Sequence, residues 1–184
     1  MNLDQFRTAL KGGTRQNRFS ISGQIFDRGS LRNMSDFAGG NGNLLVKAGQ
    51  IPPSTLGIIP VPFRGRIAKM VGDRQYLEWP IVIYDTTETI YRAFQGWSES
   101  ANDHFSNTQN ASWTDAPGPS LTRWKVDHLD LTTPGTTVLK SVELVNCWPV
   151  EVGSIDLTYD ALDTIVEFPV TIAYDYFDLI GSPG

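Results

Sequence analysis

The chain has 184 residues, of which 40% are hydrophobic and 19% are charged, and it contains 17 glycines and 11 prolines. This length suits one domain with its own core, and the glycine and proline content favours short strands and turns over long helices. No apolar run approaches the roughly 20 residues of a membrane helix. The first residues, MNLDQFRTALKGG, lack the pattern of a secretory signal. We therefore expect a protein that folds in a cytoplasm and does not insert into a membrane.

Charge is unevenly distributed along the chain. The formal net charge is −5, yet residues 1–80 contain 11 Lys and Arg against 5 Asp and Glu, whereas residues 81–184 contain 4 against 15. Chance clustering on solvated surfaces is the simpler explanation. The alternative is a subunit whose basic and acidic parts attract neighbouring copies, which favours head-to-tail self-association.

The sequence carries no catalytic, cofactor or metal motif that we can defend. It lacks a nucleophile elbow, a phosphate-binding loop and a paired-cysteine motif. The single cysteine, Cys147, lies in an apolar context and is interpreted as a small buried residue. His128 lies between Asp127 and Asp130, but side chains alternate across a strand, so a surface histidine is a better interpretation than a metal ligand. We expect no catalytic activity, no cofactor and no bound metal.

The N-terminal part predicts a short helix, a strand and a polar loop. Asn2 can cap an amphipathic helix over residues 3–11. Apolar residues alternate over 19–25 and predict a strand. Residues 27–43 are rich in Gly, Ser and Asn and predict a loop, which a short strand at 44–46 follows.

Residues 55–84 are the most distinctive part of the chain. Apolar runs at 58–63 and 76–83 predict the two strands of a hairpin, joined through a segment between Gly65 and Gly72. The basic residues of this connecting arm are Arg64, Arg66, Lys69 and Arg74. Such an arm could bind nucleic acid or an acidic protein surface. Because the chain is acidic overall, we favour a protein partner.

A helix and two more strands are predicted in the middle of the chain. Asp85 and Glu88 have the spacing of a capping box, and apolar residues then recur at helical spacing as far as residue 101. We interpret the apolar stripe of this helix as a face packed on a sheet, although it could also be an interface. Alternation over 124–131 and 138–149 predicts the two strands.

The stretch from residue 150 to residue 177 predicts a long antiparallel hairpin with one apolar face. Its strands alternate over 155–159 and 166–176, with a polar connection at 160–164. Pro169 cannot donate a hydrogen bond, so we expect the second strand to lie at a sheet edge or to contain a bulge. The core residues that we expect are Trp79, Phe94, Trp97, Phe168, Val170, Ile172 and Tyr174.

Two blocks of the sequence resemble the tail tube proteins of contractile-tailed bacteriophages. The first block contains VPFRGR at 61–66, GDR at 72–74 and then Trp79; the second contains WPV at 148–150, SIDLTYD at 154–160 and YDYF at 174–177. The predicted helices lie where that family has helices. The resemblance covers most of residues 44–177 and is poor in the two polar regions at 27–43 and 102–122.

The resemblance implies a mainly β fold, an antiparallel β-sandwich or barrel with one flanking α-helix and a short N-terminal helix. It implies a single tail-tube domain over 1–184, with a helical arm at 1–16, the sandwich at 17–178 and a tail at 179–184. Six copies would close into a ring, and rings would stack into the inner tail tube, through which DNA passes without specific binding. The implied partners are further copies of the chain and the tail sheath, baseplate and tail-terminator proteins. The implied location is the virion tail, with the host cytoplasm during assembly.

The charge pattern then predicts how rings would stack. We expect the basic arm to contact an acidic face of a neighbouring copy, with candidate residues Asp156, Asp160, Asp163 and Glu167. Two alternatives remain open. One is a specialised member of the same family, such as a baseplate tube-initiator or the related ring of a type VI secretion system. The other is a carbohydrate-binding β-sandwich that exposes tryptophans in a groove, although Trp79, Trp97 and Trp148 fall in apolar patterns.

Overall fold

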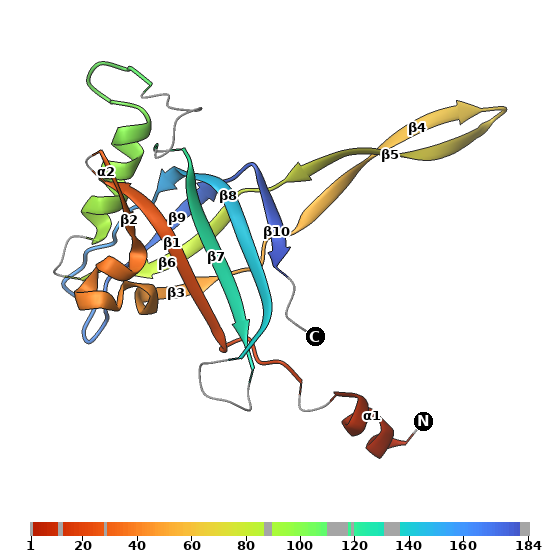
Figure 1. Cartoon of the computed structure of the whole chain (residues 1–184), viewed down its shortest axis with the longest axis horizontal. Helices are drawn as coiled ribbons and strands as arrows, with labels where there is room; N and C mark the ends of the chain where they lie inside the picture. The colour runs from red at the N-terminus through yellow and green to blue at the C-terminus, as the bar shows by residue number, and fades with distance from the viewer. Residues whose placement is uncertain are drawn as a thin grey trace.

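The computed structural model describes residues 2–10, 13–27, 29–86, 90–109, 118, 120–130 and 137–180. The helices in this part of the chain are α1 (Leu3–Leu10) and α2 (Ile90–Ala101), with short 3-10 helices η1 (Met34–Asp36), η2 (Ala38–Gly40) and η3 (Gly42–Leu45). The strands are β1 (Phe19–Asp27), β2 (Ser30–Asn33), β3 (Val46–Gly49), β4 (Ser54–Phe63), β5 (Arg66–Tyr76), β6 (Trp79–Tyr84), β7 (Thr122–Leu129), β8 (Val138–Val152), β9 (Glu167–Ala173) and β10 (Tyr176–Ile180) (Figure 1). Neither α1 nor α2 is long and apolar enough to cross a membrane.

The body is an antiparallel β-sandwich in which both sheets share strand β8. Its first part pairs with β7 and β10, and Trp148–Val152 pairs with β9. The strand order is therefore β2-β1-β7-β8-β10 on one side and β8-β9-β6-β3 on the other. Asn146, with φ 57°, lies where β8 changes partners. A bent strand of this kind can pass from one sheet to the next and form a corner.

Trp124 lies at the centre of the core, where both sheets and α2 meet. Its ring stacks on that of Trp97 in α2, with centroids 6.4 Å apart, and meets Trp79 of β6 edge-on at 5.8 Å. Phe94 of α2 contacts Trp124 at 6.1 Å and Phe168 of β9 at 5.9 Å. The predicted packing of this helix on the sheets is therefore confirmed. The residues expected in the core are all buried: Trp79, Phe94, Trp97, Phe168, Val170, Ile172 and Tyr174.

The space for Trp124 depends on a glycine in the neighbouring strand. Gly23 of β1 pairs with Trp124, and a Cβ atom at position 23 would lie 2.1 Å from the indole ring. No side-chain adjustment relieves such an overlap in a close-packed core. The glycine in the predicted alternating strand 19–25 therefore has a packing reason that alternation alone does not reveal.

The predicted hairpin of residues 150–177 is wrong. Residues 155–159 form no strand, and the partner of β9 on this side is the end of β8. The second predicted strand is also two strands, since Tyr174 and Asp175 separate β9 from β10, which pairs with the first part of β8. Alternation in 155–159 was misleading because it is a local pattern, whereas strand pairing depends on which distant segments meet.

Pro169 does not mark a sheet edge, contrary to our expectation. β9 lies between β8 and β6, and the register shift is in β8, between Pro149 and Glu151. Gly153 donates its backbone N–H to the Pro169 carbonyl over 2.8 Å. The return bond, which would need an N–H on Pro169, cannot form, and β8 ends at Val152. The proline is tolerated because it lies where the ladder to β8 stops.

Residues 27–49 contain more structure than the predicted loop. β2 forms a hairpin with β1, and three 3-10 helices follow before β3. The strand predicted at 44–46 begins only at Val46 and pairs with β6. At the N-terminus the predicted helix is confirmed over Leu3–Leu10, where the Asn2 side chain accepts a hydrogen bond from the Asp4 N–H. Glu88 of the predicted capping box lies outside the described residues.

Replacing Trp97 by alanine should destabilise the protein by about 3–5 kcal/mol, because the cavity would open between both sheets and the helix. Chemical denaturation measures this loss. The matched control is Arg92→Ala on the exposed side of the same helix, where the change should stay within about 0.5 kcal/mol. An unchanged unfolding midpoint for Trp97→Ala would contradict the packing described above.

Candidate assembly interface

β4 and β5 form a long two-stranded ribbon, residues 54–76, that projects away from the sandwich (Figure 1). The ribbon is a sheet of its own, in which Ser54 pairs with Tyr76 and Phe63 pairs with Arg66. This corrects the predicted hairpin, which paired 58–63 with 76–83. The segment interpreted as a connecting arm is strand β5, and β6 instead joins the second sheet between β3 and β9.

Only Arg64 and Gly65 form the turn of the ribbon. Both have positive φ, 45° and 77°, as a two-residue type I′ hairpin turn requires. Glycine adopts this conformation at little cost, and arginine is an uncommon residue there. The guanidinium of Arg64 lies 5.4 Å from the centroid of the Phe63 ring, which places a cation and an aromatic ring together at the tip.

Most apolar side chains of the ribbon are exposed. Their exposed fractions run from 39% for Val61 to 77% for Val71. They belong to both strands: Leu56, Ile58, Ile59, Val61, Phe63, Ile67, Met70 and Val71. A large contiguous apolar surface that is exposed in this way is typical of an interaction site.

The ribbon is anchored to the body through its last residue. The Tyr76 ring lies 5.5 Å from that of Phe177 and 5.9 Å from that of Tyr174. Burial at this contact raises the pKa of the Tyr174 hydroxyl. The anchor fixes where the ribbon leaves the sandwich, and it leaves the tip free to reach another molecule.

The four basic residues predicted for the arm all lie on this ribbon. Each of them is exposed: Arg64, Arg66, Lys69 and Arg74. The only acidic residue within residues 54–76 is Asp73. None of the ion pairs found among the described residues involves these cations. The ribbon therefore presents positive charge together with apolar surface.

The connection between β8 and β9, residues 153–166, has the opposite charge and a similar apolar content. It contains three of the predicted acidic residues and no basic residue: Asp156, Asp160 and Asp163. Its exposed large apolar side chains are Leu157, Tyr159, Leu162, Ile165 and Val166. We call this segment the acidic loop. With Lys47 and Tyr84 it borders a hollow of about 600 Å³.

The ribbon and the acidic loop lie on opposite sides of the subunit. In Figure 1 the ribbon extends to the right, whereas the loop between β8 and β9 lies at the left. The fourth predicted acidic residue, Glu167, already forms an ion pair with Lys47 of the same chain, and this bond raises the pKa of Lys47. Glu167 is thus less suited than the other three to an intermolecular contact.

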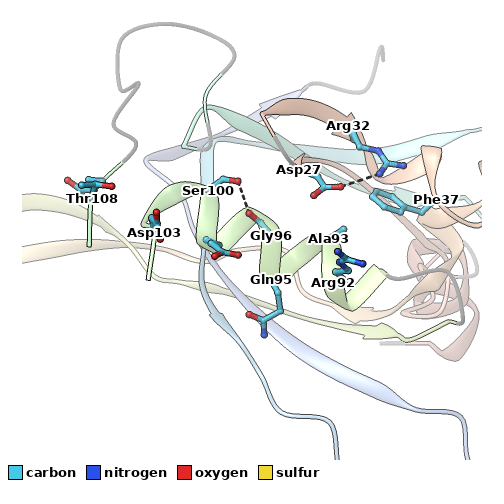
Figure 2. A pocket seen from close by; sticks show the side chains of 12 residues that line it. Asp27, Arg32, Phe37, Arg92, Ala93, Gln95, Gly96, Ser100, Asp103 and Thr108 are labelled. Atoms are coloured by element: carbon cyan, nitrogen blue, oxygen red, sulfur yellow. Dashed lines mark hydrogen bonds and ion pairs between the residues drawn. The ribbon is translucent and has the colours of Figure 1, made fainter. Parts of the chain in front are cut away.

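A second concave surface lies between α2 and the β1–β2 hairpin (Figure 2). It encloses about 680 Å³. Asp27 forms an ion pair with Arg32 at 3.3 Å, and the Arg32 guanidinium lies 4.3 Å from the centroid of the Phe37 ring. The residues that line it carry both positive and negative charge, and they include Arg92 and Asp103. This surface offers no convergent catalytic arrangement.

One group of possible metal ligands is present in the described part of the chain. Glu99, Asp103 and His104 bring one ligand atom each within 4.8 Å of one another. The Asp103 carboxylate accepts hydrogen bonds from the backbone N–H of Phe105 and from Ser106, which lower its pKa and occupy its oxygens. These bonds explain the position of Asp103 without an ion.

Comparison with known proteins gives sequence relatives over most of the chain. The chain is 26% identical over 143 residues to the tail tube protein gp19 of Enterobacteria phage T4, covering 77% of the chain and 84% of the relative. It is 26% identical over 132 residues to the tail tube protein of Serratia phage KSP90, covering 71% of each. The chain is therefore similar to phage tail tube proteins over most of its length. No protein-family model matches it.

Solved structures show the same fold at much lower identity. A chain in the six-fold symmetrised baseplate of the anti-feeding prophage has a TM-score of 0.62 with 8% identity, and the match covers 92% of this chain and 97% of the other. A chain in the extended sheath–tube complex of an extracellular contractile injection system has a TM-score of 0.57 with 13% identity, covering 98% and 99%.

The environment of the tryptophans argues against the carbohydrate-binding alternative. Trp79, Trp97 and Trp124 are completely buried, and Trp148 is partly buried. None of these four can serve as an open stacking platform for a sugar ring, which would need an exposed face.

Sequence reasoning missed the exposure of the apolar residues in the ribbon and in the acidic loop. Alternating apolar residues usually indicate burial. The ribbon was interpreted as part of a hairpin with a basic connecting arm, and residues 155–159 were interpreted as a strand with one apolar face. One signal in the sequence was informative. Pro60 and Pro62 lie in one apolar run, and neither can donate a hydrogen bond, so two missing donors in one strand disfavour a place at the centre of a larger sheet.

The purified protein should carry no stoichiometric zinc or iron. In the cluster of Glu99, Asp103 and His104, hydrogen bonds already occupy the Asp103 carboxylate, and the His104 Nδ1 lies 2.9 Å from a Glu99 carboxylate oxygen. Elemental analysis after dialysis checks this expectation. A molar equivalent of metal that is lost in a Glu99→Gln variant would contradict it.

Trypsin should cut the unassembled subunit within residues 54–76 well before it cuts the sandwich. A two-stranded ribbon without a packed face is only marginally stable and opens locally. Mass spectrometry of early digests should show cleavage after Arg64, Arg66 or Lys69 well before cleavage after Arg123 or Lys125 in β7, which serve as the control. Equal rates at both places would mean that the ribbon is as protected as the sandwich.

Proposed function

We propose that this chain is a structural subunit of a phage tail tube. Copies of the chain assemble into rings, six to a ring, and the rings stack head to tail into the inner tube of a contractile tail. The tube is the conduit through which DNA leaves the virion. The proposal is supported by the homology to tail tube proteins and by a fold found in tube-bearing contractile assemblies.

The observation that carries the proposal is the unburied ribbon. An isolated two-stranded hairpin is at best marginally stable in water, and burying one large apolar side chain is worth about 1.5–3 kcal/mol. When another subunit covers the ribbon, its exposed apolar side chains become buried, and this burial stabilises the ribbon. This makes self-assembly part of the subunit's stability.

Charge supports a head-to-tail arrangement. The basic ribbon and the acidic loop lie on opposite sides of one subunit, so the attraction acts between copies and not within one. One exposed ion pair contributes only about 0.2–1 kcal/mol. Six such pairs engaged together at each junction would contribute several kcal/mol. Contacts between different surfaces of identical subunits repeat without closing, which produces a filament.

The remaining parts of the proposal concern partners and organisation. Residues 17–178 act as one sandwich unit, 1–16 as a helical arm and 179–184 as a tail, although β10 extends this unit to Ile180. The tube contacts the sheath, baseplate and tail-terminator proteins, and DNA slides through the lumen without specific binding. The protein works without a cofactor and without catalysis, within the virion tail after assembly in the host cytoplasm.

Reversing charge on the ribbon should prevent tube growth without unfolding the subunit. The double variant Arg66→Glu with Lys69→Glu replaces attraction to the acidic loop by repulsion, so assembly should stop at rings or monomers. Circular dichroism checks the fold, and negative-stain electron microscopy measures tube length.

The control makes the same change of charge outside the ribbon, Arg92→Glu with Lys140→Glu, at two exposed positions of α2 and β8. It should leave tube length unchanged. Tubes of normal length from a normally folded ribbon variant would refute the role of the ribbon's charge in stacking.

A further inference from the structure

The ribbon exposes apolar side chains on both of its faces. Side chains that are paired across an antiparallel ladder share a face, and successive pairs alternate. Ile59 pairs with Met70 and Ile58 pairs with Val71, so these neighbouring pairs point in opposite directions. Their exposed fractions are 52% and 60% for the first pair and 64% and 77% for the second.

The same division holds along the rest of the ribbon. The first face carries Ile59, Val61, Phe63, Arg66, Ala68 and Met70, and the second carries Ile58, Pro60, Pro62, Ile67, Lys69 and Val71. Each face thus combines apolar residues with one cation near the tip. A ribbon that lay on a single surface would need only one apolar face and would place polar residues on the other.

Two exposed surfaces of this chain match that chemistry. One is the acidic loop, where Leu157 and Ile165 lie beside Asp156 and Asp163. The other is strand β10, on which Tyr176, Asp178, Leu179 and Ile180 are exposed, whereas Phe177 packs against the core. Residues 153–166 and 176–180 each combine exposed apolar side chains with at least one carboxylate, and neither segment contains a basic residue.

We propose that each ribbon is held between two other copies of this chain, one covering each face. The acidic loop of one copy covers one face, and the β10 surface of another copy covers the other. The inference rests on the proposed tube, and it adds that one ribbon joins three subunits. Apolar burial on both faces then supplies the driving force, and on each face the cation near the tip, Arg66 or Lys69, sets the register against a carboxylate.

Paired substitutions test the two faces separately. Ile58→Thr with Val71→Thr removes apolar surface from one face, and Ile59→Thr with Met70→Thr removes it from the other, with β-propensity and charge retained. Each variant should raise the critical concentration for tube growth about tenfold or more. The matched controls exchange the residues, Ile58→Val with Val71→Ile and Ile59→Met with Met70→Ile, and should stay close to the wild type. A loss confined to one face would overturn the inference.

Photo-crosslinking gives a readout that does not require tubes. A benzophenone amino acid at position 58 or at position 59 should crosslink to two different surfaces of other copies, one within 153–166 and one within 176–180. Both crosslinks in a protein that forms no tubes would support the two-sided contact and reject the proposed tube. Tubes could also form with a crosslink from one position only, with both crosslinks on one surface, or with no crosslink. Each of these results would reject the two-sided contact and leave the proposed tube standing.

Discussion

Aromatic packing around Trp124 holds the sandwich together and divides this subunit into a self-sufficient body and a dependent ribbon. The indole contacts rings from β6 and α2, and Gly23 in β1 leaves the room that it needs. Every layer of the body therefore shares one buried cluster. Tyr76 joins the ribbon to this body, whereas most of the ribbon's apolar residues are exposed and lie outside the buried core.

This division explains how a folded subunit can be built for assembly. The body satisfies the requirements of a small globular domain, with the aromatic cluster around Trp124 buried and its strands paired. The ribbon leaves apolar surface and positive charge in solvent, and the acidic loop does the same with negative charge. Surfaces that are costly in an isolated molecule become favourable when identical neighbours cover them, which is the physical basis of the proposed tube.

Local pattern predicted the elements better than it predicted their partners. The helix carrying Phe94 and Trp97 was recognised because apolar residues at helical spacing require one buried face. The segment 155–159 was misjudged because alternation shows only that a strand is possible. Pro169 was misjudged for a related reason. A missing N–H costs little where the neighbouring strand ends, and the sequence around Pro169 does not show where β8 ends.

The sequence by itself determined the β-rich class, the two helices, the core aromatic residues and the resemblance to tail tube proteins. These depend on composition, local periodicity and short blocks of sequence. It also located the four cations between Arg64 and Arg74. Only the tertiary structure decided that these cations lie on a ribbon with two open faces, and that the acidic loop lies on the far side of the body. Exposure is a property of what surrounds a residue, and alternating apolar side chains have the same sequence pattern whether their cover comes from the same chain or from another copy.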